Sequence, residues 1–208
     1  IFRIAQTHGF NHFRFHTWCP PEAAFVAADR LGVYLNPETP TWTDGFWPAE
    51  FTRPRMNNRP KPFGGDPAVV AFTRRELQRL SEVYGNHPSF CLVTIGNELG
   101  NADWALGARL IEEERVRDPR RVYAVSTARD LTAADDFFVT HATKGGAVRG
   151  LGKPSTDWDF ANGMAGLEVP VIAHETGQRP VFPDWSALRR YTGPLRPGNL
   201  EVFRDRMA

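Results

Sequence analysis

The chain has 208 residues, of which 41% are hydrophobic, and its 25 basic residues nearly balance its 24 acidic ones. This composition is typical of a folded globular protein with a sizeable core and argues against intrinsic disorder. Because the net charge is close to zero, no nucleic-acid partner is expected, and no stretch approaches the ~20 apolar residues of a membrane span.

Short apolar runs alternate with longer segments of helical periodicity along the whole chain. Proline or aspartate stands at the start of several helical segments, and glycine or proline follows their ends, as expected for helix boundaries. The predicted helices are residues 1–8, 21–31, 67–84, 103–117 and 199–207. The predicted strands are residues 12–16, 33–36, 90–95, 122–126, 137–141 and 170–175. Strands that alternate with helices indicate repeated β/α units and a parallel sheet.

Three long loops rich in proline, glycine and tryptophan follow predicted strands, at residues 39–65, 142–166 and 177–197. Loops after strands form the catalytic face of a (β/α)8 TIM barrel. Helix-like sequence precedes the first strand and follows the last loop, so a complete barrel needs one further strand beyond each end. We therefore predict an α/β fold in which residues 1–208 form one partial catalytic barrel domain without the first and eighth strands.

Two predicted strands end in a glutamate preceded by a polar residue. The apolar run at residues 90–95 stops at Gly96, Asn97 and Glu98, and the last strand ends in His174 and Glu175. Two carboxylates at the ends of parallel strands suit glycoside cleavage, in which one donates a proton and the other attacks the anomeric carbon. Each dipeptide alone also fits a helix cap or a solvated turn. The matched positions favour a catalytic pair of Glu98 and Glu175.

The first predicted strand carries polar side chains where a barrel strand is normally apolar. Its sequence, HFRFH, alternates two phenylalanines with His12, Arg14 and His16. Alternation places these three side chains on one face, which in a barrel is the interior. An edge strand with one solvated face is the alternative interpretation. We expect Arg14 and His16 to contribute to a substrate site.

Aromatic rings and histidines add to the candidate binding residues. Sugars stack on aromatic rings, and most of the six tryptophans, including Trp158, lie in or beside the predicted catalytic-face loops; a role in the core is the alternative for each. His141 and His174 stand at strand ends, where they could donate hydrogen bonds to a sugar. A metal-dependent hydrolase is a competing hypothesis, but no HxH or HExxH pair is present. We predict no metal and no cofactor.

The two cysteines, Cys19 and Cys91, permit either one disulfide or two buried thiols, and both alternatives stay open.

Three ordered motifs resemble glycoside hydrolase family 2. They are GFNHFRFHTWCPPEAAFVAADRLGVYLNPE, HPSFCLVTIGNELG and VPVIAHETGQRPVFPD, which are distributed from residue 9 to residue 184, so the resemblance extends along nearly the whole chain. The resemblance implies that Glu98 is the acid/base and Glu175 the nucleophile. It also implies that Asn97 hydrogen-bonds the sugar 2-hydroxyl, that Arg14 orients the nucleophile, and that His16 lines the subsite of the non-reducing sugar.

The sequence departs from the family pattern in three respects. His141 stands where a tyrosine often neighbours the nucleophile, and the tryptophan of the eighth strand and the N-terminal β-sandwich domains lie outside this sequence. The expected activity is that of a retaining exo-β-glycosidase with a carbohydrate substrate, β-galactosides first. Pairing of Arg179 or Lys144 with a uronate would instead favour β-glucuronides or β-galacturonides. A non-catalytic carbohydrate-binding remnant is the second hypothesis, and a periplasmic or secreted location is compatible with either.

Overall fold

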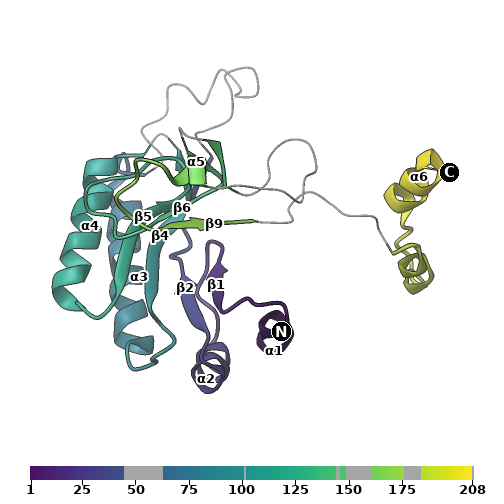
Figure 1. Cartoon of the computed structure of the whole chain (residues 1–208), viewed down its shortest axis with the longest axis horizontal. Coiled ribbons are helices and arrows are strands. Elements are labelled where there is room, and N and C mark those ends of the chain that lie inside the picture. The colour runs from purple at the N-terminus through teal and green to yellow at the C-terminus, as the bar shows by residue number, and fades with distance from the viewer. Residues whose placement is uncertain (45–62, 101, 144–145, 149–160, 176–183, 208) are drawn as a thin grey trace. The chain divides into compact units, whose positions relative to one another are not determined.

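The computed structural model describes residues 1–44, 63–100, 102–143, 146–148, 161–175 and 184–207 (Figure 1). The chain divides into two compact units, Ile1–His174 and Glu175–Ala208, and each is described by itself. The helices of the first unit are α1 (Phe2–Thr7), α2 (Glu22–Leu31), α3 (Pro67–Tyr84), α4 (Trp104–Arg117) and α5 (Ala161–Met164). Its strands are β1 (His12–Phe15), β2 (Tyr34–Pro37), β3 (Trp42–Asp44), β4 (Leu92–Gly100), β5 (Val122–Thr127), β6 (Phe138–Thr140), β7 (Ala142–Thr143), β8 (Gly146–Ala147) and β9 (Val171–Ala173).

The strands of the first unit form three sheets, one of which is the short antiparallel pair of β7 and β8. In the other two sheets, β1 pairs with β2, and β3, β4, β5, β6 and β9 follow one another in that order, and all of these pairings are parallel. Two parallel bridges, Leu35 to Phe90 and Glu38 to Thr94, join the segment of β2 to that of β4. All six predicted strands are therefore confirmed, and so is the α/β class with parallel strands.

Helices α3 and α4 lie next to each other on one face of the five-stranded sheet (Figure 1). Each begins at an aspartate: the Asp66 side chain accepts a hydrogen bond from the amide of Ala68 (2.8 Å), and that of Asp103 accepts one from Leu106 (2.9 Å). These N-caps satisfy backbone donors that a helix start leaves unpaired. Burial of the apolar faces supplies the main core, which includes Leu77, Leu80, Leu110, Ile111, Val93, Ile95, Tyr123 and Val125.

Successive side chains of β4 point to opposite faces of the sheet, so every second one points away from the helices. Val93 and Ile95 pack against the helices, so the intervening Thr94 points to the other side of the sheet. There its hydroxyl meets the carboxylate of Glu38, and polar groups from several strands gather around that contact. This is the face on which the sequence predicts a substrate site.

The predicted loops contain structure that the sequence did not indicate. β3 lies within the predicted loop 39–65, and β7, β8 and α5 lie within 142–166. β4 also runs further than predicted, to Gly100, because β3 pairs with its last residues. Such short elements depend on a partner strand rather than on their own apolar pattern.

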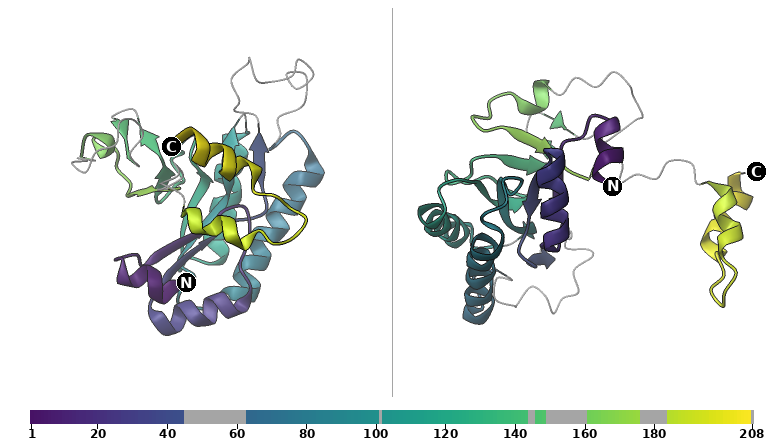
Figure 2. Two further views of the ribbon diagram at one scale, coloured as in Figure 1. Left: turned by 90° about the vertical axis from the view of Figure 1, so that its right-hand side faces the viewer. Right: turned by 90° about the horizontal axis from the view of Figure 1, so that it is seen from below.

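The second unit contains a 3-10 helix, η1 (Trp185–Arg190), and the helix α6 (Gly198–Met207). The two helices lie together, with the rings of Trp185 and Phe203 5.9 Å apart between centroids (Figure 2). Residues 199–207 were predicted as a helix, and this is confirmed. The prediction that residues 1–208 form one partial barrel domain stays a prediction.

Cys19 and Cys91 are both present as thiols, so the disulfide alternative is wrong for this structure. Burial raises the pKa of the Cys19 thiol to about 11 and also raises that of Cys91. Within the described residues, no helix combines the length and the apolar character needed to cross a membrane.

Candidate active site

Five described residues other than glycine have a left-handed backbone: Thr17 (φ 62°), Glu98 (45°), Ala128 (61°), Arg129 (82°) and Glu175 (52°). Every one of them stands at or just after the carboxyl end of a parallel strand, namely β1, β4, β5 or β9. This conformation costs a side-chain-bearing residue about 1–3 kcal/mol and is concentrated at functional sites. In the five-stranded sheet, Glu98, Ala128 and Arg129 therefore mark the carboxyl ends of β4 and β5, where the sequence predicts catalytic residues.

Close packing of β3 against β4 shapes the backbone around Glu98. A Cβ atom on Gly96 would lie 2.0 Å from the carbonyl oxygen of Thr41, so only glycine fits there, and the amide of Asn97 donates to that same oxygen (3.1 Å). The pairing of β4 with β5 ends at Asn97, after which the amide of Leu99 donates to the Ser126 hydroxyl (3.1 Å). Glu98 occupies the distortion between these two contacts.

The carboxylate of Glu98 forms an ion pair with Arg129, with 3.0 Å between Oε2 and Nη2. The two side chains are largely shielded from solvent, with 14% and 23% of their surfaces exposed. Arg129 follows β5, the strand next to β4, so neighbouring strand ends bring the two charges together. The sequence did not indicate this partner of the predicted acid/base.

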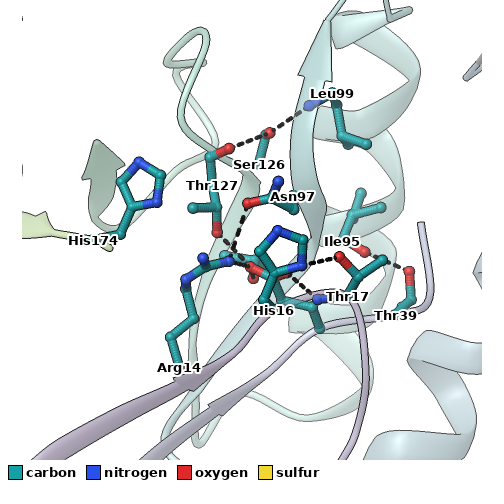
Figure 3. A network of polar contacts seen from close by, with 12 residues as sticks. Arg14, His16, Thr17, Thr39, Ile95, Asn97, Leu99, Ser126, Thr127 and His174 are labelled. Carbon is teal, nitrogen blue, oxygen red and sulfur yellow. Dashed lines mark hydrogen bonds and ion pairs between the residues drawn. The ribbon is translucent and has the colours of Figure 1, made fainter. Parts of the chain in front are cut away.

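A buried carboxylate, Glu38, contacts residues of several strand segments, among them Arg14, Thr17 and Thr127, which are labelled in Figure 3. Its Oε1 pairs with Nη1 of Arg14 (2.6 Å) and accepts hydrogen bonds from the hydroxyls of Thr94 (3.0 Å) and Thr127. Its Oε2 accepts from the backbone amide of Thr17 (2.7 Å). Glu38 is fully buried and the Arg14 side chain is 10% exposed, so the pair needs these further hydrogen bonds. One carboxylate thus holds together residues from four strand segments.

Asn97 is fully buried beside this network. Its Oδ1 accepts a hydrogen bond from Nη1 of Arg14 (3.3 Å), as Figure 3 shows. Its Nδ2 is buried and has no hydrogen-bond partner among the described residues. Leaving a buried donor unpaired costs about 1–3 kcal/mol, so this amide nitrogen has an unused capacity to donate a hydrogen bond.

His16, just after β1, and Trp42, the first residue of β3, lie edge to face, with ring centroids 5.2 Å apart. The Nδ1 of His16 also hydrogen-bonds the hydroxyl of Thr17. Trp42 leaves half of its surface exposed, and Trp18 nearby in the chain is similarly exposed. An exposed indole fixed against a neighbouring ring is suited to stacking on a sugar face.

His141 and His174 contact each other at the ends of β6 and β9, with 3.3 Å between Nδ1 and Nε2. His174 is buried, so this contact is shielded from solvent. No cluster of three or more metal-ligating side chains occurs in the part of the chain that the structure describes.

The structure therefore brings several predicted residues together within the first unit. Arg14 and Asn97 share a hydrogen bond, and His141 contacts His174. Glu175 belongs to the second unit, so its approach to Glu98 and the orienting contact from Arg14 stay predictions. Trp158, Lys144 and Arg179 lie outside the described residues.

His12 provides a stability test of the strand that carries Arg14. Burial, and secondarily the positive charge of Arg14, lowers the pKa of His12 from its usual 6.5. Below about pH 6.5, His12 binds a proton more readily in the unfolded chain than in the folded chain. The free energy of unfolding should therefore fall as the pH drops below about 6.5. Urea unfolding between about pH 5 and 8 should show a shallower pH dependence for His12→Gln. If the free energy of unfolding depended on pH equally in His12→Gln and in the unsubstituted protein, the lowered pKa of His12 would be contradicted.

The chain spans a quarter or less of the length of three solved structures of similar fold. β-D-Glucuronidase of Dictyoglomus thermophilum matches 67% of the chain with 24% of its own length, at a TM-score of 0.56 and 21% identity. Parabacteroides merdae β-glucuronidase matches 69% of the chain with 17% of its own length, at a TM-score of 0.53 and 19% identity. Bacteroides uniformis β-glucuronidase 3 matches 67% of the chain with 17% of its own length, at a TM-score of 0.51 and 21% identity. No family model and no curated protein matches. At these identities the likeness establishes a shared fold.

Proposed function

We propose that this chain is the catalytic part of a retaining exo-β-glycosidase of the (β/α)8-barrel type. The observation that carries the proposal is the strained backbone of Glu98 at the end of a parallel strand, next to the buried amide nitrogen of Asn97, which has no hydrogen-bond partner in the part of the chain that the structure describes. Catalytic side chains of parallel barrels stand at this end of the strands. The similarity in fold to β-glucuronidases is consistent with this assignment.

In the proposed reaction, Glu98 gives a proton to the glycosidic oxygen while the carboxylate of Glu175 bonds to the anomeric carbon. The bond between that carbon and the leaving oxygen breaks with its electron pair going to the oxygen. Glu98, now ionised, then takes a proton from water, whose oxygen displaces Glu175. Two inversions leave the sugar with its original β configuration.

The supporting residues follow from the contacts around Glu98. Asn97 would donate through Nδ2 to the sugar 2-hydroxyl, a hydrogen bond that strengthens in the transition state. Arg14 holds the Asn97 amide in place from the other side and would also reach Glu175. We assign sugar contacts to His16, His141, His174 and Trp158, in keeping with the sequence prediction.

The sugar itself is proposed as β-galactose or β-glucuronic acid. The sequence motifs favour β-galactosides, whereas the solved structures of similar fold are named as β-glucuronidases. A galactoside needs only hydroxyl contacts, but a uronate needs a cation near C6.

A panel of nitrophenyl β- and α-glycosides tests the proposal in the full-length protein. We expect hydrolysis of a β-galactoside or a β-glucuronide, no hydrolysis of the α-anomers, and a β-configured first product by proton NMR. Chelator should leave the rate unchanged, because no metal takes part in the proposed steps. Calorimetric binding of a sugar without turnover of any substrate would instead support the non-catalytic carbohydrate-binding remnant.

A further inference from the structure

Arg129 contacts Glu98 from a turn that is itself strained. Ala128 and Arg129 are consecutive left-handed residues, and neither is glycine. Ala128 is fully buried and its amide donates to the carbonyl of Val139 (2.6 Å), so the turn is fixed to β6. A strained turn that is held this firmly indicates a functional requirement for the position of the residue it carries. Here that residue is Arg129.

The same arginine is one of the residues that line a cavity of about 590 Å³. Its walls include the apolar side chains of Leu131, Phe138 and Leu167 and the hydroxyl-bearing Thr143. Among the described residues that line it, Arg129 is the basic one and Asp130 the acidic one. The cavity is large enough for a ring of the size of a sugar or a phenyl group.

The proposed reaction makes different demands on Glu98 before and during catalysis. In the structure its carboxylate pairs with the Arg129 guanidinium, which is the arrangement of a charged carboxylate. Proton donation requires the neutral acid, so the contact with Arg129 must loosen once substrate is bound. A second carboxylate that offers Arg129 an equivalent partner would exchange with Glu98 at little net cost, because guanidinium pairs with either in the same geometry.

We propose that the cavity beside Arg129 binds a carboxylate carried by the leaving part of the substrate, and that this contact releases Glu98 for proton donation. Because Glu98 protonates the leaving oxygen, its neighbour Arg129 lies on the leaving-group side of the cleaved bond. The preferred substrate is then a β-glycoside whose next unit is acidic, such as a uronic acid or a benzoate. The inference rests on the proposed function and makes Arg129 a specificity-determining residue.

Matched leaving groups test the inference in the full-length protein. The 3-carboxyphenyl and 3-carbamoylphenyl β-glycosides of the accepted sugar have nearly the same shape and differ in charge. We expect kcat/KM to favour the carboxylate by about 10-fold, with both a higher kcat and a lower KM. In Arg129→Gln the kcat/KM values of the two substrates should agree within about twofold. Arg129→Lys should retain part of the preference for the carboxylate. A purely structural role of Arg129 would slow both substrates equally.

Two controls make each outcome decisive. Arg74→Gln is the same substitution at an exposed arginine on α3, paired with Glu113 away from the cavity, and should keep the full preference. Calorimetry on Glu175→Ala should show the carboxyphenyl glycoside binding about 10-fold more tightly than its amide even without turnover. Equal binding and equal kcat/KM in the unsubstituted protein would overturn the inference. Persistent hydrolysis by Glu175→Ala would overturn the proposed function and leave the binding preference as a separate result.

Discussion

Replacing Glu175 by alanine in the full-length protein should lower kcat for an aryl β-glycoside by about 10³-fold or more, because no carboxylate is left to form the glycosyl-enzyme bond. Binding of substrate should change far less, so KM or a calorimetric Kd should stay within about 10-fold. Steady-state kinetics on a nitrophenyl β-galactoside and a nitrophenyl β-glucuronide measure the effect.

Glu168 provides the matched control for Glu175. It is an exposed glutamate that precedes β9, and Glu168→Ala should retain at least about half of the activity. Glu98→Ala should behave differently from Glu175→Ala: it should lower kcat/KM for poor leaving groups by about 10²-fold or more but change kcat/KM for a dinitrophenyl leaving group little, since that group needs no protonation. Full activity of Glu175→Ala would remove the basis for its assignment as nucleophile.

Replacing Glu38 by alanine should destabilise the first unit by about 3–5 kcal/mol. The change leaves the guanidinium of Arg14 buried without its carboxylate and removes the acceptor for Thr17, Thr94 and Thr127. Breaking a buried pair is costly because the remaining charge loses its opposite charge in a place shielded from water. Urea unfolding followed by circular dichroism measures the difference.

Glu113→Ala is the comparison for Glu38→Ala. Glu113 also pairs with an arginine, Arg74 at 2.9 Å, but both side chains are about half exposed. Exposed ion pairs contribute little, so this substitution should cost no more than about 1 kcal/mol. A similar loss of stability in both variants would show that the Glu38 network is not the structural centre that its contacts indicate.

The order of strands and helices could be predicted from the sequence because each has a local signal. Asp66 and Asp103 start α3 and α4 as N-caps, and apolar runs such as residues 90–95 are recognisable as buried strands without any tertiary information. β3 could not be found in this way. It has three residues, and its position depends on pairing with the end of β4 across Gly96, which no local pattern encodes.

Part of the candidate site was also predictable. Glu98 and Asn97 were recognised because a polar pair interrupts an apolar strand, and Arg14 because it alternates with phenylalanines. Glu38 was missed because the predicted strand ended at Asn36 and a glutamate after Pro37 is most simply read as part of a loop. Its role depends on donors from three other strand segments.

Arg129 was missed for a related reason. In the sequence it stands in a polar segment, TARD, that is typical of a solvated turn. Its left-handed backbone and its contact with Glu98 depend on the pairing of β4 with β5 and on the attachment of Ala128 to β6. Contacts between strand ends are set by the whole sheet, so sequence periodicity predicts the strands more readily than the partners of their last residues.

Covalent trapping tests the central claim most directly. A 2-deoxy-2-fluoro-β-glycoside with a dinitrophenyl leaving group, in galactosyl and glucuronyl forms, should label the full-length protein once, because the fluorine slows hydrolysis of the intermediate. Peptide mass spectrometry should then locate the sugar on Glu175, and Glu175→Ala should remain unlabelled. A sugar attached to another residue, or turnover of the parent glycoside without any trapped intermediate, would contradict a retaining mechanism that uses Glu98 and Glu175.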